Sequence, residues 1–296
     1  MTEGKPRVTE SRKVWTTLIT NTKYLSGLLT LDYSLKKQKS KYPLVALYTD
    51  AFPEEGHAVL KARSIPAQRV EYLLPTKGKD YSADPRFYDC WTKLTPFSLT
   101  EYDRVVQLDS DIVGGKGKKV FAAGHACVCN PLKKPHYPKD WIPENCAFTS
   151  QHSTPDVAQH TSADPSVGPL GFMNGGLQVV NPSSAVYNLI LDHMESGAAI
   201  DMDFADQSLL SDLFRSCWVP LPYIYNALKT LRWEGVHSPI WQDDKVKNIH
   251  YILAPKPWDE EGDQKGKSDP THAWWWNVND ERLTKEKENG IVADGY

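Results

Sequence analysis

Several features are missing from this sequence of 296 residues, and each absence removes a class of protein. No apolar run approaches the length of a membrane span, and the polar start MTEGKPRVTESRK contains no apolar signal core. The 34 basic residues are dispersed and the formal net charge is -3, so nothing indicates a nucleic-acid surface. We therefore expect a globular, cytoplasmic protein without a membrane span or a nucleic-acid partner.

The glycine-rich phosphate loop Gly-x-Gly-x-x-Gly is also absent after the first predicted strand. Dinucleotide-binding folds depend on that loop, so its absence disfavours them. If this chain binds a phosphorylated ligand, we expect a metal ion to provide much of the phosphate binding.

Cysteine is scarce, with five residues at positions 90, 127, 129, 146 and 217, all within or beside apolar stretches. The number is odd, and we interpret them as reduced thiols in or near the core. Cys127-Val128-Cys129 lacks the second closely spaced pair that is typical of a structural zinc site. The spacing therefore disfavours a metal role for these cysteines.

The N-terminal half alternates between strand and helix patterns. The segments VWTTLIT (14–20), YPLVALYTD (42–50) and RVEYLLP (69–75) predict strands, with helices over 22–38 and about 53–63 between them. This order indicates an α/β domain with a parallel sheet and right-handed crossovers. We assign the domain to residues 14–258, between a polar lead (1–13) and a charged, Trp-rich tail (259–296).

The segment VVQLDSDIV (105–113) follows a helix predicted over 87–103 and interrupted at Pro96. It is apolar until it ends in Asp109 and Asp111. Ligands of open α/β sheets bind at the carboxyl ends of strands, and two aspartates one residue apart can share one hard cation such as Mn²⁺ or Mg²⁺. The alternative is that Asp-Ser-Asp only begins a loop.

Further polar groups follow a long irregular segment (129–169). A strand predicted within 169–184 carries Asn174-Gly175-Gly176. The helix predicted over 202–214 places Asp203, Asp206 and Gln207 on one face of its first turn, where acids also serve as ordinary helix caps. A strand within 246–258 carries His250 and is followed by Lys256. The tail reads as a flexible linker (259–269) and an element whose three tryptophans cover an apolar surface (271–283).

Taken in order, seven segments resemble the retaining glycosyltransferases of family 8 over residues 14–258. They are LITNTKY, WTKL, LDSD, MNGG, DFADQ, LPYIYN and HYILAPKPW. The resemblance implies one domain of the GT-A type, in which helices flank a Rossmann-like, mainly parallel sheet. It also implies an enzyme that transfers a hexose from UDP-glucose or UDP-galactose with Mn²⁺ as cofactor.

The resemblance assigns roles to individual residues of this chain. Leu18, Thr20, Asn21 and Tyr24 would hold the uridine end of the donor. Asp109, Asp111 and His250 would coordinate Mn²⁺, with Ser110 between the aspartates. Lys93 and Lys256 would face phosphates or sugar. The donor sugar and the reaction face would be lined by Asn174, Gly175, Asp203, Asp206 and Gln207.

Asp206 and Gln207 are the candidate catalytic residues. Retention at the anomeric carbon requires either a carboxylate nucleophile or attack from the face that the diphosphate leaves. Both routes stay open at this point.

This chain departs from the family pattern in two places. Leu253 stands where the family usually has glycine, three residues after the metal histidine. After Asp111, IVGGKGKKV leads almost at once to the next strand, so this passage is either naturally short or lacks part of a loop, and the unusual junction Val113-Gly114 favours the second.

Self-glucosylating members of the family carry an acceptor tyrosine shortly after the LPYIYN segment. The corresponding position here is Trp233, and an indole has no hydroxyl group to accept a sugar. We therefore expect a separate small-molecule or carbohydrate acceptor, bound against aromatic residues near Trp233 or Trp274–Trp276.

Two other functions deserve comparison. In a phosphatase of the haloacid-dehalogenase type, Asp109 would be phosphorylated, Asp111 would act as acid and base, and Asp243 and Asp244 would hold Mg²⁺. The long βα sequence that precedes Asp109 disfavours this fold. A non-catalytic relative that binds sugar nucleotides is disfavoured because binding alone would not require the Asp-Gln pair beside the metal residues.

Overall fold

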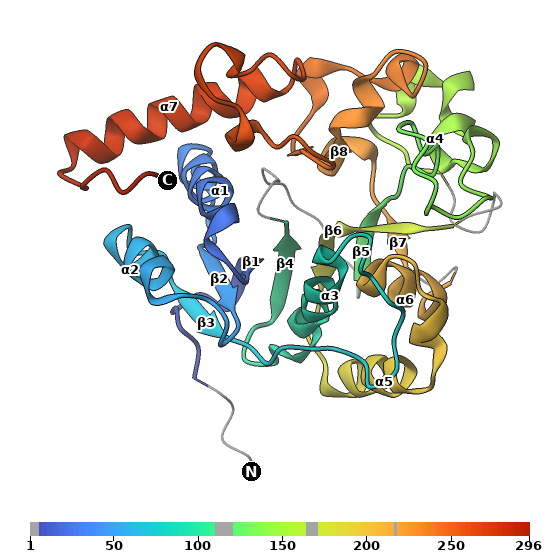
Figure 1. Cartoon of the computed structure of the whole chain (residues 1–296), viewed down its shortest axis with the longest axis horizontal. Helices are drawn as coiled ribbons and strands as arrows, with labels where there is room; N and C mark the ends of the chain where they lie inside the picture. The colour runs from blue at the N-terminus through green and yellow to red at the C-terminus, as the bar shows by residue number, and fades with distance from the viewer. Residues whose placement is uncertain (1–5, 110–120, 164–170, 216–217) are drawn as a thin grey trace.

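The computed structural model describes residues 6–109, 121–163, 171–215 and 218–296. Its main sheet has seven strands in the order β3-β2-β1-β4-β6-β5-β7 (Figure 1). The strands are β1 (Lys13–Ile19), β2 (Leu44–Tyr48), β3 (Ala67–Arg69), β4 (Arg104–Leu108), β5 (Phe121–His125), β6 (Met173–Val180) and β7 (Val219–Pro220). Only β6 runs antiparallel to its neighbours, β4 and β5, so the predicted mainly parallel α/β sheet is confirmed.

Both faces of the sheet are covered, which explains the continuous apolar runs of its central strands. On β1, Trp15 packs into a cluster with the leucines of α1, whereas Val14 packs with Val45 and Val105 on the other face. Helices α1 (Leu25–Lys37) and α2 (Glu54–Ala62) cover the first face. Helices α5 (Ser184–Glu195) and α6 (Ala205–Leu213), with the 3-10 helix η2 (Trp91–Ser98), cover the opposite face of β5 and β6.

Two predicted elements end earlier than expected. The strand expected over 69–75 is β3, which stops at Arg69 because its neighbour β2 ends at Tyr48, the residue paired with Arg69. The helix expected over 87–103 is a short α3 (Arg86–Cys90) followed by η2, and it ends at Ser98. Pro96 lies in this last turn, where it has no N–H to continue an α-helical ladder.

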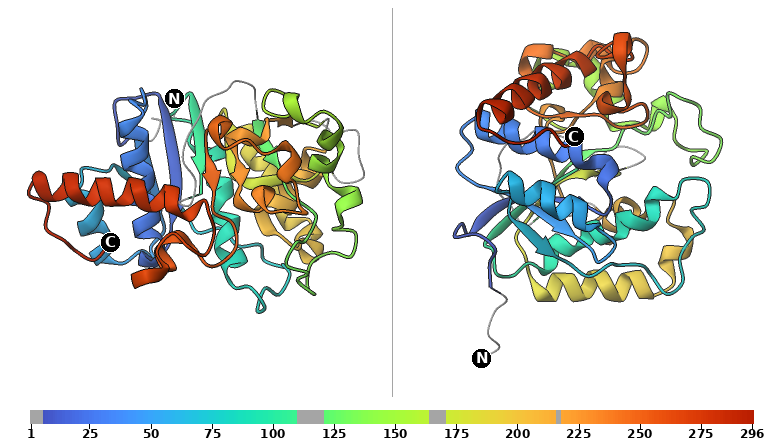
Figure 2. Two further views of the ribbon diagram at one scale, coloured as in Figure 1. Left: turned by 90° about the horizontal axis from the view of Figure 1, so that it is seen from above. Right: turned by 60° about the vertical axis from the view of Figure 1, so that its left-hand side comes forward.

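The tail does not behave as a flexible linker. Within 259–269, Glu260 is buried and accepts hydrogen bonds from the Gly266 and Ser268 amides (2.6 and 3.1 Å). The Trp-rich element is part of a longer helix, α7 (His272–Glu288), which packs across α1 (Figures 1 and 2). Trp275 is buried against Ile249 and Tyr251, so the predicted covering role of the tryptophans is confirmed.

The sheet order reverses at β1, because β2 and β3 extend to one side and the chain returns to place β4 on the other. Ligands of open α/β sheets bind at such a point, beyond the carboxyl ends of the strands. Residues 20–21 follow β1, Asp109 follows β4, and the antiparallel β6 brings 174–176 to the same edge, where the Asp109 amide donates to the Gly176 carbonyl (2.9 Å). Within the described ranges, none of the helices has both the length and the apolar character needed to cross a bilayer.

Candidate functional site

A cleft of about 570 Å³ opens at this edge of the sheet, a volume typical of small-ligand sites. Its lining includes Leu18, Thr20, Asn21, Tyr24, Lys93, Asp109, Asn174, Gly175, Asp206, Gln207, His250 and Lys256. Among the residues that the sequence predicts for the donor site, Ser110 and Asp111 lie outside the described residues, and Asp203 lies elsewhere. The fold therefore gathers side chains that are far apart in the sequence.

Asp109 and His250 lie side by side in the cleft, with 3.8 Å between Asp109 Oδ2 and His250 Nε2. His250 stands on the two-residue strand β9 (Ile249–His250), which pairs with β8 (Ala227–Leu228). Two ligands of one octahedral ion, each about 2.1 Å from it, lie about 3 to 4 Å apart. The separation therefore fits ligands of one hard divalent cation.

Asn226 orients His250 and is a site residue that the sequence analysis did not single out. Its Nδ2 donates to Asn174 Oδ1 (2.9 Å), so the amide oxygen faces His250 Nδ1 at 3.0 Å and must accept from it. This hydrogen bond leaves the lone pair on His250 Nε2, the nitrogen that faces Asp109. Asn226 ends the LPYIYN segment, and this position was the signal in the sequence that could have identified it as a site residue.

Lys93 contacts the same carboxylate from η2, with Nζ 2.7 Å from Asp109 Oδ1 and 2.8 Å from Oδ2. Burial alone would lower the pKa of Lys93, but the charge of Asp109 offsets burial and holds this pKa well above its usual value. Lys93 is thus a permanent positive charge beside the candidate cation position.

The two glycines of the MNGG segment are required because two functional side chains lie very close to the backbone of β6. A Cβ at Gly175 would lie 2.5 Å from Asp206 Oδ2, and one at Gly176 would clash with the ring of His250. Glycine therefore permits both functional side chains to lie against the same strand.

Asp206 and Gln207 stand in the first turn of α6. Gln207 Oε1 accepts from Asn174 Nδ2 (3.2 Å) and the Gly175 amide (3.1 Å), so hydrogen bonds connect Gln207 through Asn174 and Asn226 to His250. Burial raises the pKa of Asp206 to about 7, with Asp109 adding to the rise and Lys93 opposing it. A buried carboxyl that titrates near neutrality inside a cleft is typical of functional sites.

Asp203 does not share this face. It lies before α6 begins at Ala205, pairs with Lys79, and lines a separate, smaller pocket. The sequence predicted a helix that already included residue 203, which is wrong. The backbone at Ala205 has φ of 45°, a left-handed conformation that no continuing helix contains.

The pocket for the predicted uridine end follows β1. Asn21 Nδ2 donates to Thr20 Oγ1 (3.2 Å), and Thr20 Oγ1 donates to Asp89 Oδ2 (2.8 Å). Asp89 also lines the cleft and was missed in the sequence, because its segment carries no motif. The Tyr24 ring packs edge-on against Trp258, 5.8 Å between centroids.

Lys256 and Leu253 close the cleft beyond β9. Lys256 is buried and its Nζ donates to the Tyr251 carbonyl (2.7 Å). Leu253 has φ of 63°, so this position keeps a conformation that glycine adopts readily even though the residue is leucine.

The opposite wall comes from the irregular segment after β5. Its aromatic residues include Tyr137 and Trp141, and Trp141 stacks on Phe204 with 4.3 Å between centroids. The tryptophans expected at the acceptor position are not part of the lining: Trp233 donates to Asp269 (2.7 Å), and Trp274–Trp276 lie on α7. Sequence reasoning missed this wall because its residues follow no periodic pattern.

Asp243 and Asp244 do not approach Asp109. They pair with Arg232 and Lys245 respectively and do not line the cleft. A phosphatase site would require them beside Asp109, so the haloacid-dehalogenase alternative is wrong.

Comparisons with known proteins agree with this geometry. The sequence model of Glycosyl transferase family 8 matches residues 16–262. Galactinol synthase 4 of Arabidopsis thaliana is 26% identical over 301 residues, covering 96% of this chain and 85% of that protein. Galactinol synthase 1 of Ajuga reptans is 26% identical over 307 residues, covering 98% and 88%.

Solved structures show the same fold at lower identity. The glycosyltransferase GlyE of Streptococcus pneumoniae TIGR4 aligns with a TM-score of 0.57 and 16% identity, over 94% of this chain and 64% of that one. An active-site glutamine-to-glutamate mutant of LgtC aligns with a TM-score of 0.58 and 12% identity, over 90% and 96%. The chain therefore belongs to glycosyl transferase family 8 and is a glycosyltransferase.

Proposed function

We propose that this enzyme transfers a hexose from UDP-glucose or UDP-galactose to a separate small acceptor, with retention at the anomeric carbon and dependence on Mn²⁺. The observation that carries the proposal is the pairing of Asp109 with His250, 3.8 Å apart, in a cleft whose floor also holds Asp206 and Gln207. The names of the relatives, galactinol synthases, support a small polyol as the acceptor.

The residues present fit a hard cation. Asp109 supplies a carboxylate oxygen, and His250 is held by Asn226 in the tautomer that presents Nε2. The second aspartate of the motif, Asp111, is proposed as the third ligand from its place in the sequence. The bound ion would stabilise negative charge on the departing diphosphate.

Two lysines are proposed to supply fixed positive charge for the same leaving group. Lys93 lies against Asp109, and Lys256 also lines the cleft. Ammonium groups held in place before the reaction stabilise charge that develops as the bond to the diphosphate breaks. We assign both residues to diphosphate binding.

Asp206 and Gln207 are proposed to serve the sugar. In a double displacement, the Asp206 carboxylate would attack the anomeric carbon as the bond to the diphosphate breaks, and the acceptor hydroxyl would then displace the carboxylate and give its proton to the released diphosphate. In same-face attack, the acceptor hydroxyl would form the new bond on the side that the diphosphate leaves, with Gln207 and Asn174 positioning the sugar. Replacement of Asp206 separates these routes, because only the first forms a bond to that carboxylate.

The proposal is tested by a screen of UDP-sugars for UDP release with Mn²⁺, Mg²⁺ or a chelator, each with and without a panel of sugars and polyols. We expect release to require Mn²⁺, to prefer one UDP-hexose and to rise with one acceptor class, and NMR of the product to show a retained anomeric configuration. Binding of UDP-sugar with no turnover under any of these conditions would support the non-catalytic alternative.

Intact-mass spectrometry tests the separate acceptor. After incubation with Mn²⁺ and each UDP-hexose, we expect the protein mass to be unchanged, because Trp233 stands where self-glucosylating relatives carry tyrosine and its nitrogen donates to Asp269. A ladder of hexose additions located on any tyrosine would contradict this expectation.

A further inference from the structure

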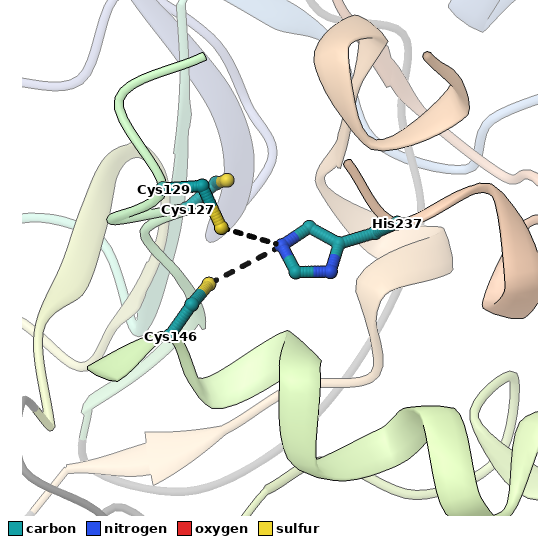
Figure 3. A group of neighbouring side chains, drawn as sticks. All are labelled: Cys127, Cys129, Cys146 and His237. Atoms are coloured by element: carbon teal, nitrogen blue, oxygen red, sulfur yellow. Dashed lines mark hydrogen bonds between the residues drawn. The ribbon is translucent and has the colours of Figure 1, made fainter. Parts of the chain in front are cut away.

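Three cysteines and one histidine meet where the irregular segment that forms one wall of the cleft contacts the segment after β8 (Figure 3). Cys127 and Cys129 follow β5, Cys146 precedes the short helix α4 (Ala147–Ser150), and His237 precedes the 3-10 helix η9 (Ser238–Ile240). We call these four residues the thiol–imidazole cluster. Cys127 also lines the cleft, but none of the four residues is among those predicted for the donor site.

The geometry approaches that of a tetrahedral metal centre. His237 Nε2 lies 3.2 Å from Cys129 Sγ and 3.3 Å from Cys146 Sγ, and all four potential ligand atoms lie within 4.8 Å of one another. In a tetrahedral zinc site with bonds of about 2.3 Å to sulfur and about 2.0 Å to nitrogen, neighbouring sulfurs are about 3.8 Å apart and sulfur and nitrogen about 3.5 Å. Only small shifts separate the cluster from these distances.

The second ring nitrogen of His237 also has a hydrogen-bond partner, here the imidazole of His152 rather than the carboxylate, carbonyl or water that is usual for a metal-binding histidine. His237 Nδ1 lies 2.9 Å from His152 Nε2, which orients the ring while Nε2 faces the sulfurs. His237 is fully buried, and Cys146 is 4% exposed. Neutral thiols are weak donors, so as ordinary core residues three of them would stabilise a buried imidazole poorly.

The ligand set selects the metal. Thiolate and imidazole ligands prefer zinc, whereas Mn²⁺ and Mg²⁺ prefer the oxygen ligands present at Asp109. Four protein ligands also fill a tetrahedral shell and leave no position for a substrate, which is the pattern of structural zinc sites. We propose that the thiol–imidazole cluster binds one zinc ion that has a structural role.

The position of the thiol–imidazole cluster in the fold indicates which segments of the chain the ion would connect. Tyr137 and Trp141, from the wall opposite the donor site, lie between Cys129 and Cys146 in the chain, and His237 reaches the cluster from a distant segment. A zinc ion would close this stretch into a loop and fasten it to the segment after β8. The aromatic wall would then keep its position although it contains little regular structure.

The sequence analysis disfavoured a metal because Cys127 and Cys129 have no second close pair. The structure shows that the other two ligands come singly from separate segments. The expectation of reduced thiols is confirmed for Cys90, Cys127, Cys129 and Cys146, and Cys217 lies outside the described residues.

The test begins with the unmodified protein, purified without added zinc and dialysed against a mild chelator. We expect mass spectrometry of the metals to find about one zinc per chain, released when a mercurial reagent blocks the thiols. Replacement by Co²⁺ should give the thiolate charge-transfer and visible bands of a tetrahedral sulfur-ligated site. Neither readout depends on UDP-sugar turnover, so failure here is distinct from failure of the proposed function.

Matched variants locate the ion. Cys129→Ser and His237→Gln should lose zinc, and their melting temperature should fall by about 5 °C or more. Cys90→Ser and His160→Gln are the controls, since Cys90 lies on α3 and His160 is exposed within the same irregular segment, and both should keep full zinc. Metal-free protein without thiolate bands in Co²⁺, or a mass lower by two hydrogens from a disulfide among these cysteines, would overturn the proposal.

Discussion

The two walls of the cleft, which we name the donor wall and the acceptor wall after the ligands that we propose for them, are built by different means. The donor wall stands on regular elements: β1, β4, β6 and the first turn of α6 place Thr20, Asp109, Gly175 and Asp206 at strand ends or a helix start. The acceptor wall, around Tyr137 and Trp141, has short helical turns and no strand among its described residues. Its order comes from side chains, including the aromatic stack on Phe204 and the thiol–imidazole cluster.

This difference has a consequence for evolution and for engineering. Backbone hydrogen bonds of the sheet hold the donor wall in place largely independently of the side chains that line it. Short sequence motifs at the strand ends can therefore indicate its chemistry. A wall held by a few side-chain contacts can change shape when those contacts change. We therefore expect donor chemistry to be general in this fold and acceptor choice to be particular to each chain.

The largest effect should come from the candidate metal ligands. Asp109→Ala or His250→Ala removes one ligand of the ion that would stabilise the leaving diphosphate, and we expect turnover to fall by about a thousandfold or more. The measurement is UDP release at saturating Mn²⁺.

Two control variants test whether the loss of turnover is specific to the candidate metal ligands. Asp244→Ala removes an exposed aspartate paired with Lys245, and His160→Ala removes an exposed histidine, and both should keep activity. If Asp109→Ala released UDP at the normal rate under chelation, the metal assignment would be wrong.

The next effect should come from the reaction face. Asp206→Asn keeps the shape of the side chain, so we expect turnover to fall about a hundredfold while affinity for Mn²⁺ and UDP stays unchanged. Asp203→Asn is the control, because Asp203 pairs with Lys79 outside the cleft. Equal losses of affinity and rate in Asp206→Asn would indicate a role in capping rather than in chemistry.

Asp206→Asn should also change how the stability of the protein depends on pH. Burial raises the pKa of Asp206 to about 7, so the folded protein keeps a proton that the unfolded chain has lost above about pH 4. The contribution of this group to stability therefore falls from about pH 4 to pH 7 and is constant above. Asp206→Asn lacks this penalty, so its melting temperature relative to the parent should rise across that interval, measured without metal.

The position of some donor-wall residues could be predicted from their pattern at strand ends, whereas others, such as Thr20 and Lys93, were predicted only through the resemblance to family 8. Asp109 ends an apolar run, and Asn174 and Gly175 interrupt one, so pattern alone marks them. Asp203 was misplaced because spacing alone cannot distinguish a residue just before a helix from one in its first turn. The β3 end depended on the length of β2, a tertiary constraint that no local pattern contains.

The acceptor wall could not be predicted for a different reason. Tyr137, Trp141 and the thiol–imidazole cluster meet through contacts between segments that lie far apart in the chain, and each segment alone looks like loop. Cys146 and His237 are single residues without a motif. Only the folded chain brings their ligand atoms within reach of one another.

A third, intermediate effect should come from Asn226, which joins the two functional groups of the donor wall. Asn226→Ala removes the acceptor of the His250 Nδ1 hydrogen bond, so we expect affinity for Mn²⁺ to fall about 10- to 100-fold. Most of the rate should return at high Mn²⁺, since His250 itself remains. Titration of activity with Mn²⁺ measures this, and a loss that Mn²⁺ does not restore would contradict it.

A fourth effect tests the division between the walls. Trp141→Phe shortens a side chain of the acceptor wall, and we expect KM for the acceptor to rise up to about tenfold with KM for the donor unchanged. Trp274→Phe, on α7 and outside the lining, is the control and should change neither. An equal rise in both constants for Trp141→Phe would mean that the two walls do not act separately.

The smallest effect should come from Leu253. Its φ of 63° costs a leucine about 1 kcal/mol relative to glycine, but Leu253→Gly also loses side-chain contacts and gives the unfolded chain more freedom. These terms oppose each other, so we expect the free energy of unfolding to change by no more than about 1 kcal/mol. Because the backbone already has the conformation that glycine adopts, affinity for UDP should change by less than about threefold. Calorimetric titration with UDP and Mn²⁺ measures the affinity, and a large gain in Leu253→Gly would show that the leucine side chain itself obstructs the diphosphate.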